Sequence, residues 1–357
     1  MKKLSPIYFL LALLAGACSN PLEYQSGEVA EVIIMNADLH TYDTTHSVWL
    51  SLGEINSVGE LPDARLNVYI NGEFAAEAST SPEPETSWGK GNGSRYVFSA
   101  DIHPGDEVRL EASWRDLHAQ ATATAPAAAS IASVDTLRVK GYNDQLDQDA
   151  STLHCKLRLV DCPGEKNWYY LLVTERSEVK RQDADGNEFF STLSSSVPYV
   201  FDQDPILSEG MDLHKDGRYN FISDLLGYDI YCPYTLFTDK AFSESSADVE
   251  IAISELYFQP SFLAYDLHVA GELTATPVRM SLTFHLLSIP YERYCYVKTV
   301  SNVNNDSKEW NPLFEPATLP SNVKGGLGFV SIASDASMTL ASVPILPDNN
   351  NIFTLNP

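Results

Sequence analysis

Short apolar runs separated by turn residues limit the possible folds more than any other feature of this sequence. In the first half, such runs cover residues 32–35, 48–52, 66–70, 96–100 and 108–114. Runs of this length are typical of strands, and their spacing predicts an immunoglobulin-like β-sandwich over residues 29–130. The clearest hairpin is predicted at Asn71-Gly72, because this dipeptide accepts positive φ at both turn positions.

The second half follows the same pattern. Alternating apolar residues at 153–159 are followed by Pro163-Gly164 and then by the apolar run at 168–173, which predicts a β-hairpin. Further strands are expected at residues 178–181, 188–193, 249–254, 264–269 and 328–332. Residues 121–132 show neither strand alternation nor a helical face, so we place a domain boundary near residue 130.

One segment of the second half favours a helix. Ser288 is a suitable N-cap, Pro290 suits the first turn, and Tyr291, Tyr294 and Lys298 follow at helical spacing. We expect a single short amphipathic helix that packs on the sheets. The predicted fold is therefore mostly β, with the sandwich followed by a larger β-rich domain over residues 131–357.

A secretory leader precedes the first strand. Lys2 and Lys3 come before an apolar run at residues 7–14, which is too short to span a bilayer, and small residues follow at 15–17. Cys18 stands where a lipoprotein signal peptidase would cut, and two or more acyl chains on it would anchor the protein stably. We therefore expect a leader over residues 1–17 and a lipidated tether over 18–28. Ordinary cleavage and secretion is the alternative, because the small residues suit that as well.

The chain is strongly acidic, with 48 Asp and Glu against 23 Lys and Arg and a net charge of -25. Such a surface repels nucleic acid and anionic lipid. Beyond Cys18, four cysteines could form two bridges in three pairings. A strand at 153–161 would hold Cys155 and Cys162 roughly 23 Å apart, so any bridge must be long-range or the thiols are free. The other two cysteines are Cys232 and Cys295.

No motif for catalysis or for a cofactor is recognisable, so we predict neither catalytic residues nor cofactors. Asp183, Asp185 and Gly186 resemble a calcium loop, but the glycine and the twelfth residue stand in the wrong places, and a hairpin turn explains them better. The acidic residues within 143–149 favour a hydrated loop over a cation site, and the histidines have no zinc-ligand spacing. Trp88, in a glycine-rich loop, is the one candidate for ligand or partner contact.

Four local motifs between residues 150 and 335 resemble a known family. They are Asp161 with Pro163-Gly164-Glu165 and Asn167-Trp168-Tyr169-Tyr170; Leu236-Phe237-Thr238-Asp239 with Phe242; Tyr291-Glu292-Arg293-Tyr294; and Phe314-Glu315-Pro316 followed by Ser321-Asn322-Val323-Lys324-Gly325-Gly326-Leu327-Gly328-Phe329. Together they resemble the domain-of-unknown-function 4249 family of outer-membrane lipoproteins. For the glycines at 325–328 we favour a structural role over a phosphate cradle, because consecutive glycines permit positive φ and close backbone approach.

The resemblance implies an outer-membrane lipoprotein, with display at the cell surface as a further expectation, and a TonB-dependent transporter barrel as partner. It implies no catalytic residue. Our leading hypothesis is a non-catalytic accessory subunit that helps the barrel to capture or gate its substrate. A fimbria-like or adhesive surface protein is one alternative, and a glycan-binding or glycan-processing surface protein is another.

Overall fold

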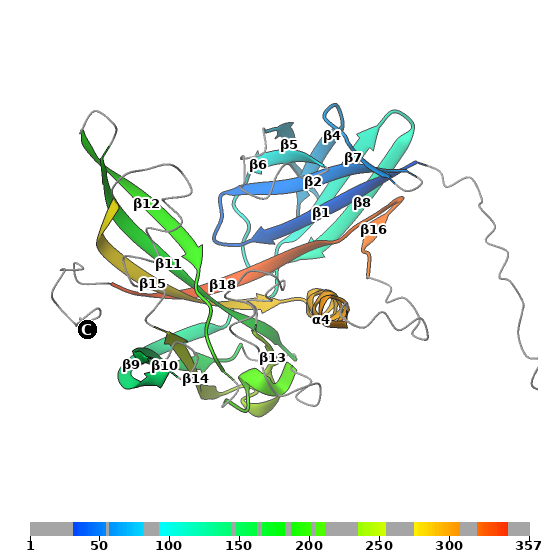
Figure 1. The fold of residues 1–357 in the computed structure, drawn as a ribbon. Helices are drawn as coiled ribbons and strands as arrows, with labels where there is room; N and C mark the ends of the chain where they lie inside the picture. The colour runs from blue at the N-terminus through cyan, green and yellow to red at the C-terminus, as the bar shows by residue number, and fades with distance from the viewer. Residues whose placement is uncertain are drawn as a thin grey trace, which may run out of the picture.

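The computed structural model describes residues 31–54, 57–81, 93–143, 148–162, 164, 166–182, 187–201, 204–210, 235–254, 275–306 and 320–341. Within them the chain is mostly β, as the apolar runs predicted, and forms a sheet of 15 strands and a sheet of three. Figure 1 shows two β bodies, with strand β18 running from one into the other.

The first body is the predicted sandwich. Its strands are β1 (Val32–His40), β2 (Thr45–Glu54), β3 (Ser57–Glu60), β4 (Arg65–Ile70), β5 (Glu73–Thr80), β6 (Ser94–Ser99), β7 (Glu107–Trp114) and β8 (Leu117–Thr124). Alternate residues along them point inward, so that Ile33, Leu50 and Leu110 are fully buried in one apolar core. The predicted hairpin is confirmed, because Asn71 and Gly72 join β4 to β5 with φ of 52° and 83°.

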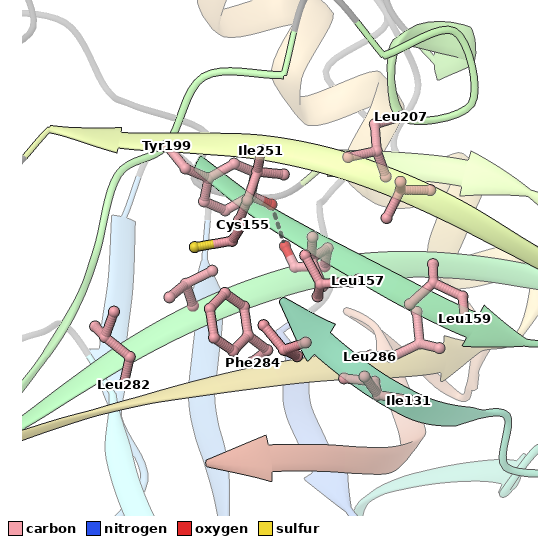
Figure 2. Close-up of a cluster of buried hydrophobic side chains, with 14 of the residues drawn as sticks. Ile131, Cys155, Leu157, Leu159, Tyr199, Leu207, Ile251, Leu282, Phe284 and Leu286 are labelled. Carbon is pink, nitrogen blue, oxygen red and sulfur yellow. Dashed lines mark hydrogen bonds between the residues drawn. The ribbon is translucent and has the colours of Figure 1, made fainter. Parts of the chain in front are cut away.

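The second body contains two sheets packed face to face. The smaller sheet has the order β14-β10-β9, formed by β9 (Ser130–Asn143), β10 (Gln148–Val160) and β14 (Ser246–Ser254). It faces the end of the large sheet that contains β11 (Trp168–Gln182), β12 (Glu188–Ser196), β13 (Thr235–Thr238) and β15 (Ala275–Ile289). Figure 2 shows the core between them, where Leu157 and Ile251 lie near Phe284 and Leu286.

The hairpin expected at Pro163-Gly164 is wrong. β10 pairs with β9 and β14, whereas β11 pairs with β12, β13 and β15, so the chain crosses from one sheet to the other between them. Both strands bury an apolar face in the same core, with Leu157 and Val173 on opposite sides of it. Alternation therefore identified the buried faces correctly but not the neighbouring strands.

Residues 121–132 contain more strand than expected. β8 continues to Thr124 and β9 begins at Ser130, so only residues 125–129 lie between strands. Alanine and threonine alternate in this part of β8, and alanine is too small to give a clear apolar pattern. Of the other expected strands, 264–269 lies outside the described residues, and the one at 328–332 is longer, forming β18 (Val330–Leu340).

β18 is shared by the two bodies. Its first part runs parallel to β1, with Ala37 opposite Val330, and its second part runs antiparallel to β15, with Leu282 opposite Leu340. Just before it, β16 (Val323–Lys324) pairs with β8 and β17 (Gly326–Leu327) pairs with β1. The C-terminal part of the chain thus contributes strands to the N-terminal sandwich, while the boundary near residue 130 stays a prediction.

The expected helix is present as α4 (Tyr291–Asp306), and two short 3-10 turns occur at Leu207–Gly210 (η1) and Asp239–Ala241 (η2). Ser288 does not cap α4. It lies inside β15, and its hydroxyl accepts a hydrogen bond from the backbone N–H of Ala129. The backbone N–H of Tyr294 donates to the carbonyl of Pro290, which places the start of the helix directly after β15.

Candidate functional site

Most residues singled out from the sequence as possible sites lie outside the described residues. These are Cys18, Trp88, Cys232 and the acidic loop residues at 144–147 and 183–186. In the part of the chain that the structure describes, no three His, Cys, Asp or Glu side chains stand close enough together to hold a metal ion.

Cys155, Cys162 and Cys295 are not in disulfides. Cys155 is fully buried in the core of the second body, and burial raises the pKa of its thiol to about 12. The thiolate is the reactive form, so Cys155 is expected to be inert in the folded protein.

The first two motifs form a buried polar corner that we call the Asp161 corner: Asp161, Asn167, Tyr169 and Asp239. The Tyr169 hydroxyl donates to one oxygen of the Asp161 carboxylate, and the backbone N–H of Glu244 donates to the other at 2.7 Å. The backbone N–H of Asn167 donates to the Asp239 carboxylate at 3.0 Å, and the backbone N–H of Asp239 donates to the carbonyl of Asn167 at 3.2 Å. These contacts turn the chain from β10 into β11, so the residues of both motifs are occupied in building the fold.

The glycine motif holds β16 and β17 against the sandwich. Gly325 and Gly328 have φ of 75° and 112°, a region that favours glycine. A Cβ on Gly326 would overlap the carbonyl oxygen of Ile33, and one on Gly328 would overlap that of Met35. The structural role predicted for these glycines is therefore confirmed, because they let the chain lie directly on the backbone of β1.

The helix motif provides a buried arginine that ties α4 to the first strand. Arg293 is 5% exposed, and its guanidinium contacts both carboxylate oxygens of Asp38 on β1, at 2.5 and 2.6 Å. The same guanidinium donates to the hydroxyl of Tyr170 at 2.9 Å. Burial would raise the pKa of Asp38, but the charge of Arg293 and contacts with His40 and Ser331 outweigh it, so the pKa is lowered.

Next to this ion pair lies a polar cluster that the sequence did not predict. We call Asp38, His40, Tyr42, His285 and Asp335 the Tyr42 cluster. The Tyr42 ring is 55% exposed and stands 5.1 Å from the His40 ring and 6.1 Å from the His285 ring. Burial, with the negative charges of Asp43, Asp335 and Asp38, raises the pKa of Tyr42 to about 12, so its phenol keeps its proton.

Together with Thr174, two residues of the cluster form an arrangement that resembles a nucleophile relay. The Thr174 hydroxyl lies 2.9 Å from Nε2 of His285, and Nδ1 of the same ring lies 3.0 Å from Asp335. Thr174, however, is mid-strand in β11 and is paired with β12 on one side and β15 on the other. The neighbouring backbone N–H groups are engaged in these ladders, so they cannot form an oxyanion hole.

The polar side chains of the Tyr42 cluster can form hydrogen bonds. Among the described residues, Oδ1 of Asp335 and Nδ1 of His40 are buried and have no hydrogen-bond partner. Buried polar atoms normally have partners, so these two atoms are exceptions. The groups of the cluster that a ligand could reach are the exposed Tyr42 ring and the exposed carboxylate of Asp38. The cluster could not be predicted from the sequence because its residues come from β1, β15, β18 and the turn after β1. The available signal was the spacing of Asp38 and His40, because residues two apart on a strand place their polar side chains on the same face.

With the geometry in place, comparison with known proteins decides the family. The model of the family described as domain of unknown function (DUF4249) matches residues 19–339. The chain belongs to this DUF4249 family. The resemblance drawn from the four motifs is thereby confirmed, and the match extends over the sandwich as well as the second body.

Other comparisons add little to the DUF4249 assignment. No curated protein matches the sequence significantly. Among solved structures, a DUF4785 family protein from Legionella pneumophila is similar at 7% sequence identity and a TM-score of 0.20, over 71% of this chain and 51% of that one. The chain thus spans about half the length of that protein, and the likeness is too weak to bear on function.

Proposed function

We propose that this DUF4249 protein is a lipid-anchored envelope protein that acts by binding, as a non-catalytic accessory subunit of a TonB-dependent outer-membrane barrel. The observation that carries the proposal is Cys18 directly after a secretory leader, because lipid on that residue fixes the compartment. No helix in the described part of the chain is long and apolar enough to cross a membrane. Attachment through Cys18 is the means of anchoring that the sequence offers.

The described residues support binding over catalysis. Polar residues of the family motifs, such as Asp161 and Arg293, are buried, and their charged atoms contact backbone or side chains within the fold. In the relay-like arrangement at Thr174 and His285, the strand that carries Thr174 is paired on both sides, so the backbone N–H groups beside it are engaged in the sheet. Because these motif side chains are occupied by contacts within the fold, we infer that other residues, on the surface, bind the partner.

The anchor is tested with Cys18→Ala, with Ser19→Ala as the matched control. Radiolabelled palmitate should be incorporated by the wild type and by Ser19→Ala, and both should fractionate with the outer membrane. Cys18→Ala should lose the label and leave the membrane fraction. A Cys18→Ala protein that stays as firmly embedded would overturn the proposal.

The partner is tested by mild detergent extraction and affinity capture of the tagged wild-type chain. A barrel of transporter size should copurify at low salt. Recovery of the chain alone, from membranes that contain such barrels, would contradict the accessory role but not the proposal of a lipid anchor.

A glycan-binding role is the second candidate, and the Tyr42 cluster favours it. Sugar rings stack on exposed aromatic side chains, and their hydroxyl groups pair with carboxylates and imidazoles. Binding to a panel of soluble oligosaccharides should be lost in Tyr42→Ala and in Asp38→Asn, whereas Tyr291→Ala, at another exposed aromatic residue, should bind as the wild type. Equal effects of the three variants would argue against this site.

A further inference from the structure

The outer edge of β12 is open among the described residues. β12 is the end strand of the large sheet and pairs with β11 over its whole length, from Glu188 to Ser196, without a register shift. β18 pairs with β15 only over residues 282–288, so β12, β11 and β15 continue past it as a three-stranded arm, seen extending away from the sandwich in Figure 1. A free edge of this length presents a row of backbone donors and acceptors.

β12 lacks the features that normally protect such an edge. Its sequence, EFFSTLSSS, has no proline, lysine or arginine, and its one charge is at the first residue. In contrast, β9, at the edge of the small sheet, carries Asp135, Arg138 and Lys140, and β16, at the other end of the large sheet, has only two residues. Charge and shortness are the usual means of preventing edge pairing. β12 has neither, so its edge is suited to pairing.

Two phenylalanines add apolar surface to this edge. Phe189 is 42% exposed and Phe190 is 60% exposed. Successive side chains of a strand point to opposite faces, so each face of the arm has one exposed phenylalanine at its margin. A strand added beside β12 would cover both.

The backbone direction shows which residues would pair. The N–H of Val197 donates to the carbonyl of Val173 on β11. Because these groups alternate in direction along a strand, the N–H and C=O of Phe190, Thr192 and Ser194 point away from β11. Thr192 is also the midpoint of β12, four residues from either end.

We propose that a second copy of this chain occupies this edge, with the two β12 strands antiparallel about a two-fold axis at Thr192. In this register Phe190 faces Ser194 of the second copy, so outward-pointing residues pair with each other and large residues face small ones. The two Glu188 residues come to opposite ends, roughly 27 Å apart, which is well beyond the screening length of about 8 Å at physiological salt. The contact is isologous and closes at two copies.

Cysteine crosslinking tests the register in the full-length chain in its own membrane. At the axis the two Thr192 Cα atoms would lie about 5.5 Å apart, which suits a disulfide. Thr192→Cys should therefore give a reducible dimer on mild oxidation. Ser196→Cys, on the same edge but roughly 27 Å from its counterpart, should give none above the wild-type background. Peptide mapping should locate the bond at residue 192 in both copies.

Sedimentation of the detergent-extracted chain provides a second measurement. The wild type should sediment with about twice the protein mass of the monomer at high concentration. Thr192→Pro removes an N–H that β11 does not use, so the dimer should be lost while the circular dichroism spectrum is kept. Thr192→Val keeps the N–H and should remain dimeric. If Thr192→Pro misfolds, Thr192→Lys, which places two charges side by side at the axis, should also be monomeric.

Two outcomes would overturn the inference. One is equal crosslinking of Thr192→Cys and Ser196→Cys together with a monomeric wild type. The other is a Thr192→Cys adduct with a different protein, which would assign the edge to another partner. The inference does not depend on the lipid anchor or the barrel, because Cys18→Ala should dimerise through the same edge.

Discussion

Replacing Gly328 by alanine is the sharpest test of the joint between the two bodies. Its φ of 112° costs a non-glycine residue about 1–3 kcal/mol. The added Cβ would also overlap the carbonyl oxygen of Met35 and lie 2.8 Å from its carbonyl carbon. Met35 pairs with Leu50 in the β1–β2 ladder and cannot easily move, so overpacking adds about 1–3 kcal/mol. The expected loss of unfolding free energy is about 2–6 kcal/mol.

Two other glycines separate the contributions to this loss. Gly72 has a positive φ of 83° but nothing within 4 Å of a Cβ, so Gly72→Ala should cost only the backbone strain, about 1–2 kcal/mol. Gly59 has ordinary contacts, the nearest at 3.8 Å, so Gly59→Ala should stay within about 0.5 kcal/mol of the wild type. The measurement is urea unfolding of the purified full-length protein, followed by tryptophan fluorescence. If Gly328→Ala were no less stable than Gly72→Ala, close backbone packing would not be the reason for this glycine.

Three further predictions concern Arg293, Asp38 and Cys155. Arg293→Met should lower the unfolding free energy by about 1–3 kcal/mol, because the buried hydroxyl of Tyr170 loses a charged partner; equal stability of the variant would contradict the role of the ion pair. Because the pKa of Asp38 is lowered in the folded state, its contribution should be present above the unfolded pKa of about 3.9 and be lost as pH falls through the folded value. The urea midpoint of the wild type should therefore exceed that of Asp38→Asn at pH 7 and approach it in acid. Maleimide should label Cys155 only after unfolding, since burial raises the pKa of its thiol to about 12, and labelling of Cys155 itself in the native protein, located by peptide mapping, would refute the buried position.

Local patterns predicted local structure well. Asn71-Gly72 specified its turn because two adjacent residues determine the backbone there, and alternation in β10 gave its buried face correctly. Helix α4 was found at its expected start, although its cap was wrong. Each of these features depends on residues close together in the sequence.

What the sequence could not predict depends on which strands become neighbours. The path from β10 to β11 reads as a hairpin because a turn joins two apolar strands, yet the two face each other across a core. The Tyr42 cluster was missed for the same reason. Asp38 and His285 stand nearly 250 residues apart in the sequence. They lie in the same part of the fold only because β1 and β15 both pair with β18. Periodicity fixes the face of a strand but says nothing about its partner.

In the described residues, the motifs by which the chain resembles the DUF4249 family contribute to its scaffold. A catalytic acid or base must reach a substrate, yet Asp161 and Arg293 are 6% and 5% exposed, and the glycines at 325–328 lie on backbone. Each motif instead fixes a junction: β10 to β11, α4 to β1, or β17 to β1. We therefore propose that binding takes place at surfaces outside the motifs, and the Tyr42 cluster and the edge of β12 are the candidates among the described residues.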